Sequence, residues 1–200
     1  MGGGISAAQA ACSLAGQGVR VTLVTRHEAR VHLFDSDPIW LGPKGMTPFL
    51  REPSYQRRRA TIDDARRRGS LPPEVFRRLD ALAQGGRLTL VEDDIVSATI
   101  DGDASVVLSL RRGQRAITAD RVVLATGFLP HRPGGALVDD AIDRFGLACG
   151  DCGYPLVSRS LEWTPGLFVT GPLAELELGP TARNISGARA AGIRLRAVAA

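Results

Sequence analysis

The sequence is poor in cysteine and aromatic residues, and it lacks a long run of apolar residues. Three cysteines among 200 residues are too few and too unevenly placed for a disulfide framework, so a reducing, cytoplasmic location is expected. No apolar run approaches the length of a membrane span, so no membrane insertion is expected. The basic runs behind the formal net charge of +4 lack an aromatic-lined groove or a docking motif, which argues against nucleic-acid binding.

Residue patterns that build metal centres and hydrolytic sites are also sparse. Cys149 and Cys152 form a C-x-x-C, a spacing that serves redox cycling or half of a metal site, but no second C-x-x-C exists. The histidines, His27, His32 and His131, are not spaced as a companion pair, so no metal site is predicted. A structural loop is the favoured interpretation of the C-x-x-C, and a redox role is the alternative. No Ser/His/Asp arrangement or carboxylate pair stands out, and no catalytic residue can be assigned.

No strand precedes the first motif of the chain. Residues 2–7 read Gly-Gly-Gly-Ile-Ser-Ala, which matches G-x-G-x-x-A, the turn that sets a dinucleotide pyrophosphate on a helix N-terminus. Either the first strand of a nucleotide-binding unit is missing or the motif is accidental. A helix predicted over residues 7–16 and a buried strand over 19–25 favour the first interpretation, because they continue a βαβ unit.

The motif predicts four cofactor-binding residues, namely Gly2, Gly4, Ser6 and Ala7. Glycine lets the backbone turn tightly and approach a pyrophosphate, and Ala7 lets the helix pack close to the sheet. The helix dipole then favours the anion. The alternative is a helix cap with spare glycines.

The end of the strand at residues 19–25 indicates which nicotinamide cofactor is used. An acidic residue there would bind a ribose 2′-hydroxyl, whereas arginine accommodates a 2′-phosphate. Arg26, His27 and Arg30 therefore favour NADPH over NADH. Glu28 leaves NADH open, and a solvated basic loop is the interpretation without a ligand.

The residue pattern changes after the strand at residues 19–25. Four prolines between residues 35 and 53 predict an ordered but irregular excursion. A basic helix is predicted over residues 55–68, with its arginine run at 57–59 on a solvated face, and another helix from about 70 to 82. Residues 35–85 thus form a helical insertion, too long for a simple connection.

Alternation with a period of two follows this insertion. It predicts short strands at residues 88–91, 95–100 and 106–110, with turns at 101–103 and 112–114. Together they form a predicted β-meander over about 88–118. The remaining predicted elements are buried strands at 121–127 and 167–171, a loop-rich region at 128–165 and a final helix over about 181–198.

The order of these motifs resembles a known family. A glycine turn, a strand, a β-meander and a strand ending in Ala125-Thr126-Gly127 is similar to flavoproteins with paired FAD and NAD(P) domains. Within them it resembles the flavin-dependent monooxygenases, including N-hydroxylating ones. The resemblance implies an α/β fold, with a Rossmann-like NAD(P)-binding domain at residues 1–127 and the C-terminal part of a FAD-binding domain at 128–200. It also implies FAD and NADPH as cofactors.

The resemblance implies further cofactor-binding residues. Residues 165–172 look like the last FAD-domain strand of the family, but Pro172 follows Gly171 where many members have an aspartate that binds the ribityl chain. Gly179 and Thr181 would then lie near the isoalloxazine, at the N-terminus of the last helix. The alternative is that this segment is only a capped amphipathic helix without a flavin-binding role. Thr126 and Gly127 complete the predicted set.

The implied activity is that of an oxidoreductase in which NADPH reduces FAD and the reduced flavin activates oxygen for a small-molecule substrate. A non-oxygenating NADPH-flavin reductase and an inactive nucleotide-binding remnant or partner-binding module are the alternatives. A strand followed by G-x-G-x-x-G, the FAD fingerprint, is absent from the 200 residues. We therefore expect a truncated chain with exposed apolar edges at 121–127 and 167–171, which needs an upstream or separate FAD-domain segment.

Overall fold

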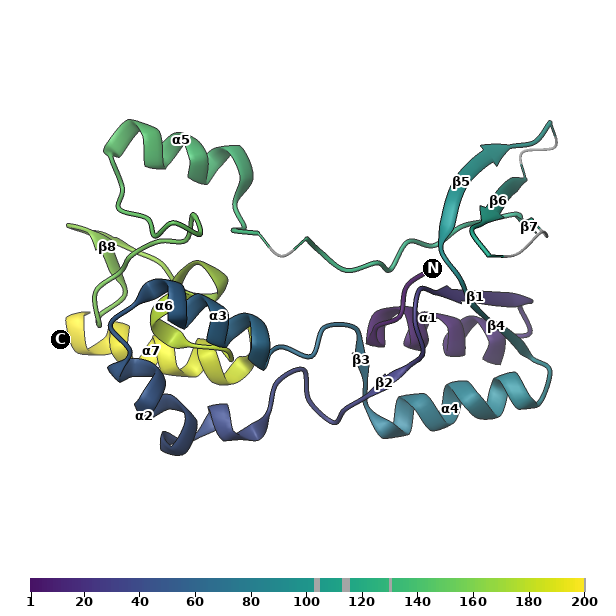
Figure 1. The fold of residues 1–200 in the computed structure, drawn as a ribbon, viewed down its shortest axis with the longest axis horizontal. Helices are drawn as coiled ribbons and strands as arrows, with labels where there is room; N and C mark the ends of the chain where they lie inside the picture. The colour runs from purple at the N-terminus through teal and green to yellow at the C-terminus, as the bar shows by residue number, and fades with distance from the viewer. Residues whose placement is uncertain (103–104, 113–115, 130, 200) are drawn as a thin grey trace. The chain divides into compact units, whose positions relative to one another are not determined.

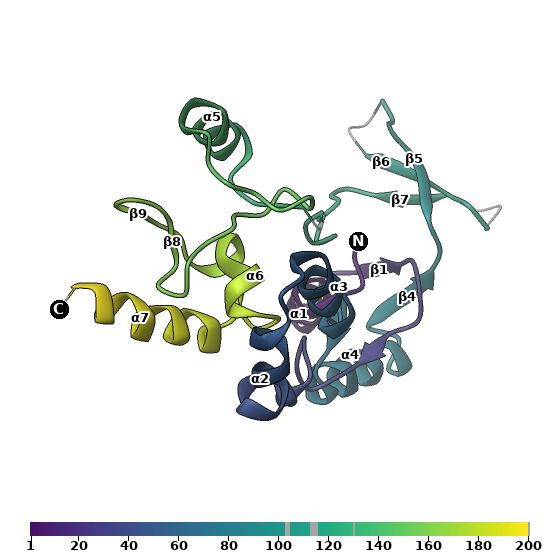
Figure 2. The ribbon, with the colours of Figure 1, turned by 60° about the vertical axis from the view of Figure 1, so that its left-hand side comes forward.

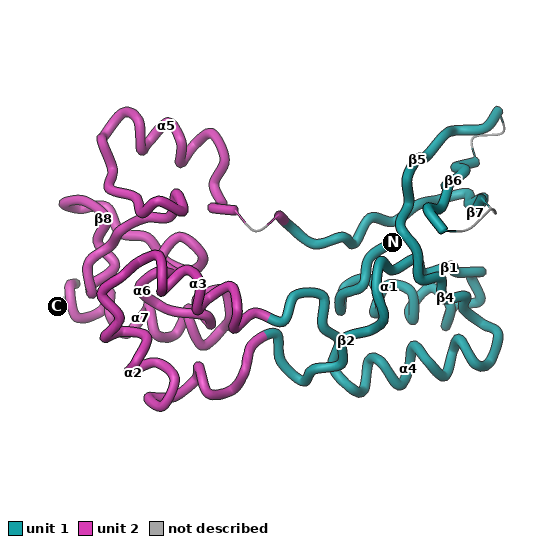
Figure 3. Tube along the Cα trace, in the orientation of Figure 1, with its two compact units in different colours: residues 1–35, 67–128 teal, residues 36–66, 129–200 magenta. Residues whose placement is uncertain are grey.

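The computed structural model describes residues 1–102, 105–112, 116–129 and 131–199. These residues form two compact units, shown in Figure 3: unit 1 contains residues 1–35 and 67–128, and unit 2 contains residues 36–66 and 129–200. Both units mix helices and short strands (Figure 1). None of the described helices is long and apolar enough to cross a membrane.

The compact units divide the chain differently from the predicted domains. Residues 36–66, which the sequence analysis placed in an insertion of the first domain, group with residues 129–200. The helix at the end of that predicted insertion belongs to unit 1. Which cofactor each unit binds stays a prediction.

Unit 1 is built on a parallel strand pair with two helices beside it. Its elements are α1 Ile5–Gly16, β1 Val21–Thr25, β2 Arg30–Val31, β3 Ser70–Leu71, α4 Pro73–Gln84, β4 Leu88–Glu92, β5 Ile95–Ile100, β6 Val106–Leu110 and β7 Ile117–Ala119. β1 and β4 pair in parallel from Val21–Leu88 to Thr25–Glu92, and β2 pairs in parallel with β3. α1 and α4 lie side by side in both Figure 1 and Figure 2.

The core of unit 1 is made largely of small side chains. The buried face of α1 consists of Ala7, Ala8, Ala11, Cys12 and Ala15, whose spacing of three to four residues follows the helical period. Side chains this small bring the helix backbone close to the sheet. Larger apolar residues from β1, α4 and β4 fill the remainder, including Leu23, Leu79 and Leu88.

The predicted β-meander is confirmed in part and corrected in part. β5, β6 and β7 form an antiparallel sheet, so the third strand is Ile117–Ala119, which the sequence analysis missed. The predicted first strand is present as β4, but it pairs with β1 instead, since its apolar residues cover α4 and α1. Asp103, Gly113 and Gln114 of the two predicted turns lie outside the described residues.

The predicted buried strand at residues 121–127 is wrong. The segment has no assigned secondary structure and Leu124 is 70% exposed. Its backbone hydrogen bonds among the described residues are made with Met1: the Met1 amino group donates to the Val123 carbonyl at 2.6 Å, and the Ala125 N–H donates to the Met1 carbonyl at 2.8 Å. A strand is buried only between pairing neighbours, and one residue supplies too few hydrogen bonds. The expected apolar exposure of this segment is confirmed.

Unit 2 is mostly helical. Its elements are the 3-10 helix η1 Pro38–Leu41, α2 Pro43–Arg51, α3 Tyr55–Ala65, α5 Gly135–Phe145, β8 Glu162–Thr164, β9 Leu167–Phe168, the 3-10 helix η2 Gly171–Ala174, α6 Glu175–Leu178 and α7 Ile185–Ala199. The core joins α7, α6 and the β8–β9 hairpin around Leu161, Trp163 and Ala191. A second cluster contains Phe49, Ile62 and Leu176.

Three expectations for unit 2 are corrected. The irregular excursion contains η1 and α2, because Pro38 and Pro43 stand in their first turns, where proline costs no helical hydrogen bond. The loop-rich region contains α5, which begins after Gly134 and ends at Gly146, both with positive φ. The buried strand at 167–171 is only the two-residue β9, and the final helix begins at Ile185.

Candidate functional site

The glycine turn directly precedes α1 and lies beside the end of β1. Gly4 is the N-cap of α1 with φ −98° and ψ 178°, and the Ala8 N–H donates to its carbonyl at 3.1 Å. No side chain among the described residues caps α1. The first-turn N–H groups lack intrahelical acceptors, so they can bind an anion at the positive end of the helix dipole.

Close backbone packing explains the first glycine of the motif. Gly2 has φ +136°, and its N–H donates to the Val24 carbonyl at 3.0 Å. A Cβ added there would lie 2.1 Å from the Ala125 carbonyl oxygen. Gly4 differs, because a Cβ there would meet only the Cα of Gly69, at 3.6 Å. Gly2 is therefore required by the fold, whereas a Cβ at Gly4 would make only an ordinary van der Waals contact.

The other two predicted residues of the motif differ in environment. Ala7 is buried against the core of unit 1, which confirms close helix packing as the reason for a small residue there. Ser6 is exposed in the first turn of α1. Of the two, only the side chain of Ser6 is open to a ligand.

One of the predicted basic residues lies directly beside the turn. A Cβ added to Gly3 would lie 3.4 Å from Cε1 of His27, and one added to Gly69 would lie 3.8 Å from its Nε2. The His27 Nδ1 is 2.8 Å from the Glu28 carbonyl oxygen, so this nitrogen carries the proton. The imidazole edge with Nε2 therefore lies near Gly3 and Gly69.

The two predicted arginines are exposed. Arg26 follows β1 directly, and Arg30 opens β2 and donates to the Arg68 carbonyl at 3.5 Å. Both are available to a solvent-borne anion. Thr126 and Gly127 follow Ala125, which packs against Gly2, and both are exposed, with Gly127 at φ +75°. Unit 1 thus gathers Gly2, Gly4, His27 and Ala125 at one end of β1.

The predicted flavin-binding residues all lie in unit 2. Gly171 has φ +59° and begins η2, with Pro172 in its first turn. Gly179 has φ +80° and ends α6; a Cβ there would lie 2.9 Å from Cε of Met46. Thr181 is buried. Gly179 and Thr181 are therefore part of the packed interior, and contact of Gly179 with a flavin requires Met46 to move.

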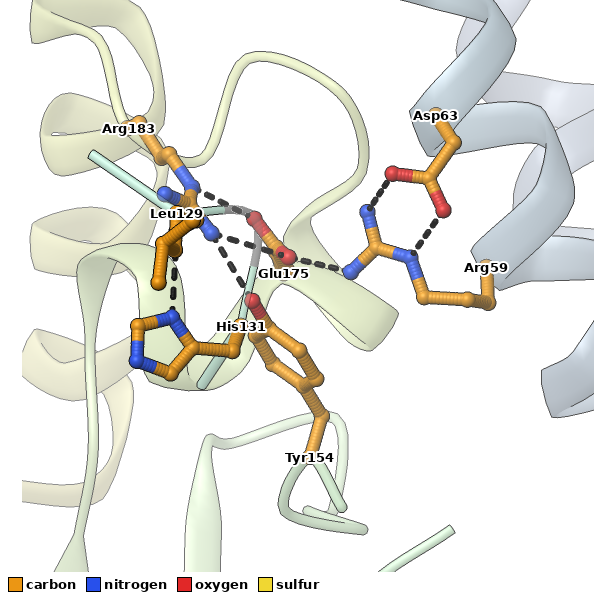
Figure 4. Close-up of polar contacts among 7 residues, drawn as sticks. All are labelled: Arg59, Asp63, Leu129, His131, Tyr154, Glu175 and Arg183. Carbon is orange, nitrogen blue, oxygen red and sulfur yellow. Dashed lines mark hydrogen bonds and ion pairs between the residues drawn. The ribbon is translucent and has the colours of Figure 1, made fainter. Parts of the chain in front are cut away.

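Sequence analysis missed the most highly charged feature of unit 2. The Glu175 side chain is 1% exposed and lies between the guanidinium groups of Arg59 and Arg183, as Figure 4 shows. Arg183 Nε donates to it at 2.8 Å, and Arg183 Nη2 donates to the Tyr154 hydroxyl at 2.9 Å. Arg59 also binds Asp63 and lies over the Tyr154 ring at 5.0 Å.

The arginines keep Glu175 ionised. Burial alone would raise the pKa of Glu175, but the hydrogen bonds and positive charges of Arg183 and Arg59 outweigh it and hold the pKa below its usual range. Burial and the Glu175 charge raise the pKa of Tyr154, whose hydroxyl stays protonated at neutral pH. The cluster is a fixed ion-pair network rather than an acid–base pair.

A second buried carboxylate repeats the arrangement. Glu177 accepts from Arg58 Nη1 at 2.9 Å and from Arg194 Nη1 at 2.9 Å. Arg58 also donates to the carbonyl groups of Glu52, Leu50 and Leu176. The expectation of a solvated face for the arginine run is therefore wrong for Arg58 and Arg59, because both reach carboxylates of α6. The alternating Glu-Leu-Glu-Leu of α6 gave no sign that the acidic residues are buried.

Metal chemistry has no support from the arrangement of side chains. Within the part of the chain that the structure describes, no group of three or more His, Cys, Asp and Glu side chains could hold a metal ion. The site with the clearest capacity for a ligand is the uncapped start of α1, where backbone N–H groups, an imidazole and exposed arginines suit a phosphorylated compound.

No protein-family model matches the sequence, and no curated protein matches it. Three solved structures are similar in fold. The first is the FAD-bound cadaverine monooxygenase DfoA from Erwinia amylovora, with a TM-score of 0.68 and 15% identity over 96% of this chain and 48% of the other. The second is the ornithine hydroxylase PvdA from Pseudomonas aeruginosa. Its TM-score is 0.71, with 18% identity over 96% of this chain and 50% of the other.

The third similar structure is the lysine monooxygenase NbtG from Nocardia farcinica, whose NADPH domain has an unusual conformation. Its TM-score is 0.52, with 20% identity over 97% of this chain and 48% of the other. This chain spans about half the length of each of the three structures. The resemblance to flavin-dependent monooxygenases that the motifs indicated is confirmed as a likeness of fold.

Proposed function

We propose that this chain is the NADPH-binding part, with the C-terminal part of the FAD-binding domain, of a flavin-dependent monooxygenase acting on a small amine. The observation that carries the proposal is the glycine turn, with an uncapped helix start, His27 beside it and Arg26 after β1. The amine follows from the substrates of the structural neighbours, cadaverine, ornithine and lysine. The first half of the FAD-binding domain would come from a separate or upstream segment.

The residues of unit 1 fit the phosphates of NADPH. The N–H groups at the start of α1 would bind the pyrophosphate, with Gly4 allowing its close approach. Arg26 and Arg30 would bind the ribose 2′-phosphate by charge-assisted hydrogen bonds. With both ring nitrogens protonated, His27 would donate from Nε2 to the same anionic group. These contacts orient the cofactor and distinguish NADPH from NADH.

The residues of unit 2 fit FAD less directly. Gly171, Pro172, Gly179 and Thr181 are proposed to face the flavin, but Met46 covers Gly179. If these residues face the flavin, α2, which carries Met46, would move away from Gly179 when flavin binds. Bound FAD would supply hydride acceptance and oxygen activation, while this chain positions it and excludes water.

The nucleotide part of the proposal is tested by calorimetric titration of the chain with NADPH and NADH. We expect NADPH to bind more tightly, and Arg26→Ala to weaken NADPH binding about tenfold without affecting NADH, because a charged hydrogen bond contributes about 1.5 kcal/mol or more. Arg87→Ala is the control: Arg87 is exposed and precedes Leu88, at the end of the β1–β4 pair away from the glycine turn. Equal effects of both substitutions would contradict the assigned role of Arg26.

The flavin part is tested by absorption spectroscopy without oxygen. FAD is added to the purified chain, and NADPH follows. Bound flavin that bleaches with NADPH supports the redox proposal. A chain that binds NADPH and ignores FAD supports the alternative of a nucleotide-binding module, because only the glycine turn would then be functional.

A further inference from the structure

The C-x-x-C lines a hollow in unit 2 that the proposed function does not use. The hollow has a volume of about 430 Å³, with Cys149, Asp151 and Cys152 on one wall and Tyr55, Gln56 and Arg59 at the start of α3 on another. A space of this size suits a small molecule. Both cysteines are free thiols.

A tight turn brings the two cysteines to the same wall. Cys149 forms an antiparallel bridge with Pro155, and the Gly150 N–H donates to the Tyr154 carbonyl at 2.9 Å. Within this loop the Gly153 N–H donates to the Gly150 carbonyl at 2.8 Å, which closes a β-turn with Cys152 at its third position. The Cys152 Sγ lies 3.7 Å from where a Cβ of Gly150 would stand, so its side chain folds back over Gly150, and both cysteines line the same hollow.

Two contacts fix this turn to α3. The Gln56 amide donates to the Asp151 carboxylate, and the Arg59 guanidinium lies over the Tyr154 ring. Arg59 is itself bound to the buried Glu175. Because the turn is held at Asp151 and Tyr154, a bond between the two sulfur atoms would order little additional chain.

The two thiols differ in access and in environment. Cys152 is exposed, whereas Cys149 is half-buried. Burial raises the pKa of Cys149, the charge of Arg132 opposes this rise, and a negative charge on Cys152 adds to it. The Arg132 side chain is 14% exposed and pairs with Asp139 through Nη2, and its Nη1 is buried without a hydrogen-bond partner among the described residues. A thiolate at Cys149 would therefore have a cation nearby.

We propose that Cys149 and Cys152 are a dithiol/disulfide site, which exchanges with small organic disulfides that enter the hollow. The Cys152 thiolate attacks one sulfur of the small disulfide, which forms a mixed disulfide and releases one small thiolate. The Cys149 thiolate then attacks the Cys152 sulfur, which forms the Cys149–Cys152 bond and releases the second small thiolate. The two protein thiols are oxidised, the small disulfide is reduced, and the two protons go to the two small thiols.

The test treats the intact chain with oxidised glutathione, blocks free thiols with an alkylating agent and analyses tryptic peptides by mass spectrometry. Residues 145–159 contain both cysteines without an internal lysine or arginine before Arg159, so they form one peptide. We expect this peptide to lose the mass of two hydrogens and to take up no alkylating agent. Cys12 is the internal control, because burial raises the pKa of its thiol and it is 1% exposed; it stays unmodified.

Two variants test the order of the steps. Cys149→Ser leaves exposed Cys152 without a resolving thiol, so it accumulates one glutathione adduct. Cys152→Ser leaves the less accessible Cys149, so its adduct forms at least tenfold more slowly. Two glutathione adducts or two alkylated thiols in the native 145–159 peptide would overturn the proposal, and so would equal rates in the two variants.

Discussion

The two units stabilise their interiors in different ways. In unit 1, α1 packs on β1 and β4 through five small buried residues, and the buried carboxylate Asp93 accepts from the backbone N–H groups of Asp94 and Arg112. In unit 2, α6 carries two buried carboxylates, each between two arginines from other helices or from the segment before α7. Apolar packing involves no titratable group, whereas an ion-pair network depends on the ionisation of each member.

Because of this difference, polar groups in unit 1 are available to bind a ligand, whereas the charged groups in the interior of unit 2 stabilise the fold. In unit 1 the apolar core leaves the N–H groups at the start of α1 without side-chain partners, so they are free to bind an anion. In unit 2 the arginines are committed to Glu175 and Glu177. Trp40 and Trp163 both belong to unit 2, so tryptophan fluorescence reports on that unit alone.

The largest effect is expected for Glu175→Gln. The substitution removes the carboxylate that Arg183 binds and leaves Arg59 paired with Asp63 alone, so unit 2 should lose about 3–5 kcal/mol of its free energy of unfolding. Urea unfolding followed by tryptophan fluorescence measures this loss. Arg57→Gln is the matched control, because the Arg57 side chain is 77% exposed in its pair with Glu52 and such a pair contributes less than about 1 kcal/mol. Similar losses in both variants would contradict the importance of burial.

A smaller effect, confined to unit 1, is expected for Gly2→Ala. The added Cβ would collide with the Ala125 carbonyl at a positive φ, which should destabilise the start of α1 by about 2 kcal/mol. Hydrogen exchange of the α1 and β1 amides measures the effect, since unit 1 has no tryptophan. In the control Gly4→Ala the Cβ meets nothing closer than 3.6 Å, so the loss should stay below about 1 kcal/mol. Unchanged exchange in Gly2→Ala would show that residues 1–2 do not pack as described.

The smallest effect on the stability of unit 2 is expected from lowering the pH. The pKa of Glu175 is lowered in the folded state, so its contribution is fully present above its unfolded value, about 4.3, and is lost as pH falls through the folded value. Fluorescence-detected stability of unit 2 should therefore change little through this group between pH 7 and 5, and should fall below about pH 4. In Glu175→Gln this part of the acid response should disappear. If the stability of the variant falls with pH in the same way as that of the native chain, the loss comes from other carboxylates and not from Glu175.

Local patterns in the sequence predicted the elements of unit 1 well. The alanines of α1 repeat with a helical period, β1 is a short apolar run, and both follow a glycine turn whose first residue only glycine can fill. The strands β4, β5 and β6 and the helix α4 were also predicted at nearly their observed positions, as was α3 in unit 2. These features depend on neighbouring residues, so the sequence contains their cause directly.

Predictions that needed distant partners failed. The segment 121–127 has the apolar composition of a buried strand, yet burial requires pairing neighbours that its own residues cannot provide. β4 resembled part of a meander, but its partner is β1. α5 lies in the region that was predicted to be loop-rich, and its Val138 and Ile142 pack on the core of unit 2.

The candidate site shows the same division. By itself the sequence determined the glycine turn, the helix that follows it and the basic residues after β1, because each is encoded within a few positions. Only the tertiary structure placed His27 beside Gly3, and only it brought Arg59 to Glu175, 116 residues away. From sequence alone, a charged residue is predicted to be solvent-exposed unless its partner is known. Burial of charge is decided by contacts between distant segments, and these form only when the chain folds.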